Sequence, residues 1–241
     1  MDDWTYEPLQ GLPPEALATN SPLMNAMRDL TYQGIQRWLR RRFHFQVEGA
    51  EVFQRTPQFI LISNHASHLD AICLLAALPP ALRNRCYSAA AADYFYTHLF
   101  KEQTARLLAN TFPFRRHEDA RRSLEACAKI LERGDSLILF PEGTRSPTGR
   151  LQPFRKGVGL LVQGTPYPVI PAYLHGASDA LGKGRRYPRA AVIRLRVGSP
   201  EVFVDAPAGK ASIEEITKRL EDRVRALSGV INEHEGDIDG R

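Results

Sequence analysis

The feature that most constrains the fold of this chain is a pair of apolar runs joined by a short polar segment. Residues 59–62 are typical of a buried strand, and residues 71–78 are typical of a buried helix. The segment between them, 63–70, reads SNHASHLD. The sequence therefore predicts that His65 and Asp70 lie five residues apart where a strand turns into a helix. Such junctions are where α/β proteins present functional side chains.

Strands and helices alternate along the rest of the chain, which predicts an α/β fold. We expect a mixed, largely parallel central sheet flanked by helices, with an amphipathic helical segment at the N-terminus. Residues 1–44 form the predicted arm and amphipathic helix, 45–230 the main domain, and 231–241 a polar tail. The predicted strands are 45–48, 59–62, 85–89, 112–114, 136–140, 169–174 and 191–197, and the predicted helices are 22–43, 71–78, 93–109, 118–133, one starting near 158, and 213–227.

The N-terminal helix over 22–43 combines apolar residues at helical spacing with a cluster of arginines at its end. One interpretation is a helix that packs on the domain and leaves a polar face in water. The other is a helix at a membrane interface, with Trp38 at headgroup depth and the arginines on anionic lipid. The sequence pattern leaves both open.

Composition narrows the possible partners and compartments. The net charge of +5 favours an anionic partner, but the arginines show no aromatic-interleaved stripe or helix-turn-helix pattern, so we do not expect nucleic acid. Cys73, Cys86 and Cys127 are scattered in apolar surroundings, as reduced core thiols are. No signal peptide is visible, and no apolar run approaches the ~20 residues that span a bilayer. We expect a cytoplasmic protein, peripheral on the inner face of a membrane.

A histidine oriented by a carboxylate can act as a general base, which is the function predicted for His65 and Asp70. Each residue also has an ordinary structural explanation: a turn histidine, and an acid in the first turn of a helix. A metal site that adds His68 lacks a further cluster of ligands. A hydrolase with Ser63 or Ser67 as nucleophile lacks the Gly-x-Ser-x-Gly turn.

A second polar segment, 140–146 (FPEGTRS), follows the predicted strand 136–140 and therefore also lies at the carboxyl end of a strand. Gly143 allows close backbone approach, Thr144 offers a hydroxyl, and the planar fork of Arg145 suits a phosphate. Glu142 can hold an arginine or accept a hydrogen bond from a hydroxyl. The same residues also form ordinary turns. Further candidate anion-binding residues are Arg115, Arg116 and Lys156.

Taken together, these segments resemble the four sequence blocks of the glycerolipid acyltransferases, of which lysophosphatidate acyltransferase is the best-known member. The blocks are Asn64-His65-x4-Asp70, the segment near Arg116, residues 140–146, and Val169-Ile170-Pro171. The first and third blocks are specific, and the resemblance covers about residues 45–200.

The resemblance implies a role for each of these residues. His65 would deprotonate the acceptor hydroxyl, and Asp70 would orient His65. The acceptor's phosphate and glycerol would lie against Arg116, Glu142, Gly143, Thr144 and Arg145, and Lys156 is a further candidate for substrate binding. The family moves an acyl group from an acyl-CoA or acyl-carrier-protein thioester to a hydroxyl, without a metal, cofactor or covalent serine.

The implied acceptor is a lysophospholipid, with 1-acylglycerol 3-phosphate expected to give phosphatidic acid, and an anionic membrane surface is the implied partner. One alternative is a different acceptor, either another lyso-lipid or an alcohol. The other alternative is a non-catalytic lipid-binding domain. The sequence departs from the family pattern at Arg115, where many members carry an acid, and in its Arg-rich N-terminal helix. A basic loop with Lys183, Arg185, Arg186 and Arg189 could contact headgroups or an acidic carrier protein.

Overall fold

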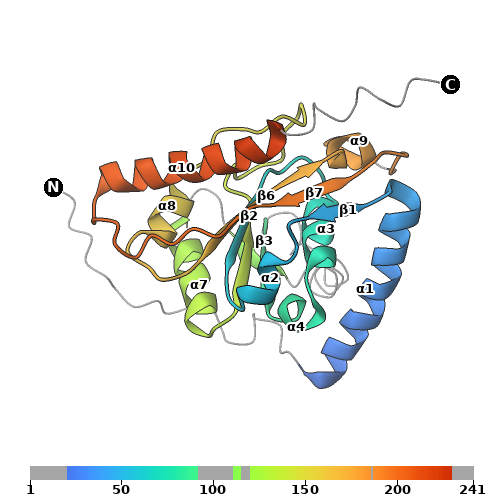
Figure 1. Ribbon diagram of the computed structural model, residues 1–241, viewed down its shortest axis with the longest axis horizontal. Helices are drawn as coiled ribbons and strands as arrows, with labels where there is room; N and C mark the ends of the chain where they lie inside the picture. The colour runs from blue at the N-terminus through green and yellow to red at the C-terminus, as the bar shows by residue number, and fades with distance from the viewer. Residues whose placement is uncertain (1–20, 92–110, 115–119, 186, 230–241) are drawn as a thin grey trace.

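A computed structural model describes residues 21–91, 111–114, 120–185 and 187–229, and the fold is given for these residues (Figure 1). The helix predicted over 93–109, Arg115 and Arg116 lie outside the described residues. So do most of the predicted arm and all of the predicted tail. The division of the chain at 44 and 230 therefore stays a prediction.

The centre of the molecule is a seven-stranded sheet with the strand order β1-β7-β6-β2-β5-β3-β4. Neighbouring strands are parallel except for β6 and β7, which are antiparallel, so the predicted mixed and largely parallel sheet is confirmed. The strands are β1 Gln46–Glu48, β2 Ile60–Ser63, β3 Cys86–Ala91, β4 Thr111–Phe114, β5 Ser136–Leu139, β6 Val169–His175 and β7 Arg194–Val197.

Helices cover both faces of this sheet and bury a separate apolar core on each (Figure 1). One core lies between the sheet and α1 and α3, and the other lies between the sheet and α7, α8 and α10. The helices are α1 Pro22–Phe43, α2 Val52–Arg55, α3 Asp70–Ala77, α4 Pro80–Arg83, α7 Ala120–Glu132, α8 Gly157–Val162, α9 Ala177–Leu181 and α10 Lys210–Gly229.

Strand β2 lies in the middle of the sheet because every one of its residues is apolar or small and is buried. Successive side chains point to opposite faces, so Ile60 and Ile62 join the core under α7, α8 and α10, while Leu61 joins the core under α1 and α3. β2 pairs in parallel with β5 on one side and β6 on the other. The loops that follow β2 and β5 therefore leave the sheet at the same edge.

Helix α1 packs on the domain with one face and exposes a second apolar face. Ser21 caps its first turn by accepting a hydrogen bond from the Met24 N–H, and His44 ends it in the left-handed conformation. Tyr32, Leu39 and Phe43 are fully buried. The outer face of α1 carries four large exposed apolar residues: Leu23, Met27, Leu30 and Trp38.

The first interpretation of this helix, packing on the domain, is thus observed, and the exposed face keeps the second open. Among the described helices, none is both long enough and apolar enough to span a bilayer.

Other differences from the sequence prediction have simple causes. Helices α2, α4 and α9 were not predicted because each is only one or two turns long, too short to show a periodic pattern. The last strand begins at Arg194 rather than at residue 191. The three cysteines are free and buried, as predicted for core thiols.

Candidate active site

The candidate active site lies at the carboxyl edge of the sheet, where the loops after β2 and β5 meet. His65 follows β2, and Asp70 is the first residue of α3. The segment 140–146 follows β5. The Ser146 N–H donates to the His65 carbonyl oxygen at 2.7 Å, which joins the two loops directly. The sequence prediction that these two segments share one edge is confirmed.

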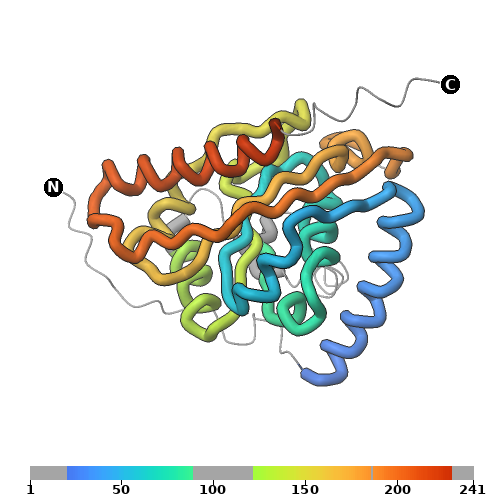
Figure 2. The backbone as a smooth tube through the Cα atoms, viewed as in Figure 1, coloured from blue at the N-terminus to red at the C-terminus, as the bar shows by residue number. Residues whose placement is uncertain are grey.

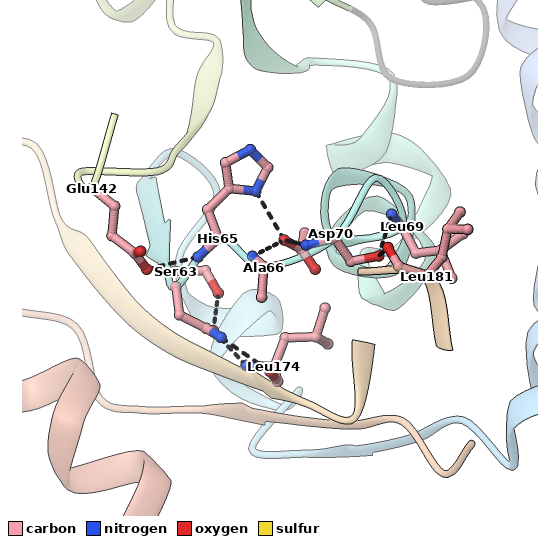
Figure 3. Close-up of polar contacts among 10 residues, drawn as sticks. Ser63, His65, Ala66, Leu69, Asp70, Glu142, Leu174 and Leu181 are labelled. Atoms are coloured by element: carbon pink, nitrogen blue, oxygen red, sulfur yellow. Dashed lines mark hydrogen bonds and ion pairs between the residues drawn. The ribbon is translucent and has the colours of Figure 1, made fainter. Parts of the chain in front are cut away.

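His65 and Asp70 form the predicted pair. The His65 Nδ1 atom lies 2.8 Å from Asp70 Oδ2, and Asp70 is fully buried, whereas the His65 side chain is 18% exposed (Figure 3). An ionised carboxylate can only accept hydrogen bonds, so the tautomer that satisfies this contact has the proton on Nδ1, with Nδ1–H donating to Asp70 Oδ2. The lone pair of Nε2 on the outer edge of the ring is then available to accept a proton from a substrate.

Backbone geometry fixes the Asp70 carboxylate in place. Its Oδ2 atom accepts from the Ala66 N–H at 2.7 Å and the Ser67 N–H at 2.8 Å, the third and fourth residues before it. An acid in the first turn of a helix also interacts favourably with the helix dipole. The five-residue spacing therefore lets the carboxylate bind the turn's backbone and the histidine at once.

The side chain of Phe140 supports the imidazole from the other loop. The two rings are stacked, with centroids 4.1 Å apart and an angle of 18° between their planes. The stacked ring limits rotation of His65 and covers one of its faces. Sequence analysis treated Phe140 as the last residue of a strand, and an aromatic residue directly before a Pro-Glu-Gly turn was the available signal.

Glu142 contacts the backbone of residues 64–69, the turn between β2 and α3, which we call the catalytic turn after its proposed role. It is 4% exposed, and its Oε1 atom accepts from the His65 N–H at 2.8 Å. Burial raises the pKa of the Glu142 carboxyl from its ordinary value of 4.5 to about 7, although the hydrogen bond from His65 opposes this rise. In this structure Glu142 therefore holds the turn that carries His65, and its binding of substrate stays a prediction.

The turn at Gly143, Thr144 and Arg145 lies beside His65. Gly143 has φ +75°, a conformation that side chains disfavour, and a Cβ there would lie 2.6 Å from Arg155 Nε. Thr144 is exposed, while Arg145 is half-buried and its Nη1 atom is buried without a hydrogen-bond partner among the described residues. An unpartnered guanidinium nitrogen beside a general base is a ready contact for an anionic substrate.

His68 lies close to the same groups. Burial lowers the pKa of His68, and the positive charge of Arg145 lowers it further, whereas the Asp70 carboxylate opposes this. His68 lies in the turn between β2 and α3, two residues before Asp70.

The structure does not favour the hydrolase alternative, because Ser63 and Ser67 are both buried and hydrogen-bonded. Ser63 donates to Asn64 Oδ1 at 3.1 Å, and the Ser67 hydroxyl donates to the Leu181 carbonyl oxygen at 2.7 Å. The side chain of Asn64 also bonds the N–H and the carbonyl oxygen of Leu174 at 2.8 and 3.1 Å. These residues connect the catalytic turn to β6 and α9 and leave no serine open to a substrate.

Within the described residues, Lys156 is not brought to this group. Lys156 donates to Glu214 on α10 at 2.6 Å, and within the described ranges no contact joins it to His65 or Asp70. Arg116 is outside those ranges. No group of three or more candidate metal-ligating side chains gathers in the part of the chain that the structure describes.

Comparison with protein families gives an independent result. A family model described as Acyltransferase matches residues 44–175, which include every predicted site residue, Lys156 among them. A 1-acyl-sn-glycerol-3-phosphate acyltransferase of Cocos nucifera is 34% identical over 157 residues, 64% of this chain and 48% of its own length. Another, of Limnanthes alba, is 31% identical over 180 residues, 73% of this chain and 60% of its own length. The chain spans about half the length of these curated relatives.

Among solved structures, the chain is similar to the 1-acyl-sn-glycerophosphate acyltransferase PlsC from Thermotoga maritima. The TM-score is 0.64 at 24% sequence identity, and the match covers 90% of this chain and 87% of that one. At this identity the likeness shows a shared fold. It agrees with the layers and the sheet described above.

Proposed function

The chain belongs to the acyltransferase family, and from that premise we propose that it moves a fatty acyl group from a thioester to the free hydroxyl of a lysophospholipid. The proposed acceptor is 1-acylglycerol 3-phosphate and the product phosphatidic acid. The observation that carries this proposal is the His65–Asp70 pair, in which Nδ1 is bonded to a fixed carboxylate and Nε2 is left open.

The proposed chemistry needs one base and one activated carbonyl. The Nε2 atom of His65 takes the proton of the acceptor hydroxyl while the hydroxyl oxygen attacks the thioester carbonyl carbon. The carbon–sulfur bond then breaks, and the leaving thiolate takes the proton back from His65. Asp70 stabilises the imidazolium between these two steps. A base placed in this way contributes a factor of ~10²–10⁴ to the rate.

Electrostatics support an acceptor that carries a phosphate. Arg145 offers a buried and unpartnered nitrogen next to His65, and Thr144 adds an exposed hydroxyl in the same turn. We propose that these two residues, with the backbone at Gly143, hold the acceptor's phosphate and glycerol. Glu142 would act through its bond to the His65 backbone rather than on the phosphate, because two anionic groups repel one another.

Helix α1 gives a reason to place the reaction at a membrane surface. Its outer face exposes Leu23 and Leu30, at 70% and 71%, next to Met27 and Trp38. A helix that already buries one face in its own domain and shows a second apolar face suits a peripheral contact with lipid. The lysophospholipid acceptor itself resides in the bilayer, so this contact would bring the site to its substrate.

The test is release of free thiol from palmitoyl-coenzyme A in the presence of 1-acylglycerol 3-phosphate. Wild type should release thiol only when acceptor is present, and His65→Ala should lower the rate by ~10²-fold or more. Lys218→Ala, an exposed change on α10, serves as the control and should keep the wild-type rate.

Three results would change the proposal. Full activity in His65→Ala would refute the base. Activity with a different lyso-lipid or an alcohol, but not with 1-acylglycerol 3-phosphate, would change the acceptor. Tight binding of lysophospholipid without turnover, with either coenzyme A or carrier-protein thioesters, would favour a non-catalytic lipid-binding domain.

A further inference from the structure

The connection between α9 and β7 is bonded to the catalytic turn at its start. The Ser67 hydroxyl donates to the Leu181 carbonyl oxygen at 2.7 Å, and Ser67 forms an isolated β-bridge with Gly182. The Leu69 N–H in turn donates to the Ser67 hydroxyl at 3.1 Å. The segment that follows α9 therefore begins next to the turn that holds His65.

The same connection lies beside the C-terminal end of α1. The Arg42 guanidinium donates to the Pro188 carbonyl oxygen at 3.4 Å, and the Ile193 N–H donates to the Phe43 carbonyl oxygen at 2.9 Å. Figure 2 shows this connection and the end of α1 side by side at the right of the view. Two segments about 145 residues apart in sequence thus form one surface.

That surface is strongly cationic. Six exposed cations belong to it, and among the described residues none of the six takes part in an ion pair with an acid. The sequence contains no Asp or Glu between 30 and 47 or between 180 and 200. We call this surface the basic rim, and its members are Arg40, Arg41, Arg42, Lys183, Arg185 and Arg189.

Apolar and aromatic side chains lie among these cations. Tyr187 is 72% exposed, and Val192 and Trp38 are also exposed. Cations interspersed with a tyrosine and a tryptophan suit the headgroup region of a bilayer, where the charge meets anionic lipid and the ring enters the interface. An acidic protein surface would satisfy the cations but would leave these apolar groups in contact with charge.

We propose that the basic rim rests on an anionic lipid bilayer and, together with the outer face of α1, holds the catalytic turn at headgroup level. The location of the turn matters only if the proposed function holds, whereas the lipid contact itself is independent of catalysis. Rim residue Lys183 directly follows Gly182, which pairs with Ser67 of the catalytic turn. The lipid contact would therefore set the distance between His65 and the lipid surface. The occupant of the rim is the membrane, and the acyl donor would approach from the aqueous side.

The experiment measures binding to vesicles of zwitterionic phosphatidylcholine with about 30% anionic phosphatidylglycerol. The loop variant is Lys183→Gln/Arg185→Gln/Arg189→Gln. A cation near such a surface contributes about fivefold to binding, so the loop variant should bind ~100-fold more weakly. The control, Arg55→Gln/Lys210→Gln/Lys218→Gln, removes three charges from α2 and α10 and should lose less than about tenfold.

A second variant tests whether weaker binding results from a local loss of structure in the loop. Arg185 donates to the Asp179 carbonyl oxygen, so Lys183→Gln/Arg189→Gln leaves that bond intact and should still bind ~25-fold more weakly. Wild-type binding should fall as salt is raised. Turnover of detergent-dispersed substrate should be the same in all variants, because in the part of the chain that the structure describes no hydrogen bond or ion pair joins a rim side chain to His65, Asp70 or residues 140–146.

Two outcomes would overturn the proposal. In the first, the loop variant binds vesicles as tightly as the control, or wild type does not bind them at all. In the second, vesicle binding is unchanged while KM rises for an acyl-carrier-protein donor alone, which would assign the rim to an acidic protein. Failure of the proposed function has a different signature: no thiol release from wild type in detergent, with normal vesicle binding.

Discussion

The buried carboxyl of Glu142 should make the protein less stable as pH rises, and Glu142→Gln should remove that effect. The pKa of Glu142 is raised by burial to about 7 in the folded protein, from an ordinary value of 4.5 in an unfolded chain. The folded state therefore binds this proton more tightly than the unfolded state. The stabilisation is fully present below about pH 4.5 and is lost as pH rises through about 7.

The size of the effect follows from the two pKa values. Each pKa unit is worth about 1.4 kcal/mol, so ionised Glu142 reduces the free energy of unfolding by about 3 kcal/mol above pH 7. Glutamine has the same shape, and its amide oxygen can still accept from the His65 N–H. It cannot ionise, so the variant should not show this loss.

The assay is urea unfolding of wild type and Glu142→Gln at pH values from 4.5 to 8. The difference between the two free energies of unfolding isolates this one group, and it should shift by about 3 kcal/mol in favour of the variant across the range. Glu214→Gln is the control: the hydrogen bond and charge of Lys156 lower the pKa of exposed Glu214 below 4.5, so this carboxyl is ionised in both states and its difference should stay nearly constant from pH 4.5 to 8. A Glu142→Gln difference that does not change with pH would refute the reasoning.

Three further changes test the site. Asp70→Asn keeps an oxygen for the turn's N–H groups but loses the charge that stabilises protonated His65. Its kcat should fall ~10²–10⁴-fold with little change in Tm, and an unchanged kcat would count against the pair. Asn64→Ala leaves the buried N–H and carbonyl of Leu174 unpaired and should lower the free energy of unfolding by about 2–4 kcal/mol in urea titrations. Phe140→Leu removes a stacked ring worth about 0.5–1.5 kcal/mol, so kcat should fall up to about tenfold at constant KM; a change in KM alone would argue against ring positioning.

Most of the sheet could be predicted because its strands are short apolar runs separated by turn residues. Residues 59–62 are buried on both faces, and a chain with several such runs between helical segments has few folds open to it other than a parallel sheet covered on both sides. The one antiparallel pair, β6 with β7, could not be predicted in this way. The apolar pattern of a strand records that it is buried but not which direction its neighbour runs.

The pairing of His65 with Asp70 was also readable from local sequence. His65 lies in the turn and Asp70 is the first residue of the helix that follows it, five residues later. Local backbone geometry therefore decides the contact between them. The roles of Phe140 and Glu142 were not readable in this way. Each lies more than 70 residues from His65, and only the parallel pairing of β2 with β5 brings them to it.

The sequence by itself therefore determined most of the strands, the longer described helices and the pairing of His65 with Asp70, because these depend on burial patterns and on contacts within a few residues. Tertiary structure decided the rest. It placed Phe140 and Glu142 against His65, directed Lys156 to Glu214, and joined the arginines of α1 to the loop after α9. Such contacts depend on strand order and register, since residues distant in sequence meet only where the sheet brings their loops to one edge.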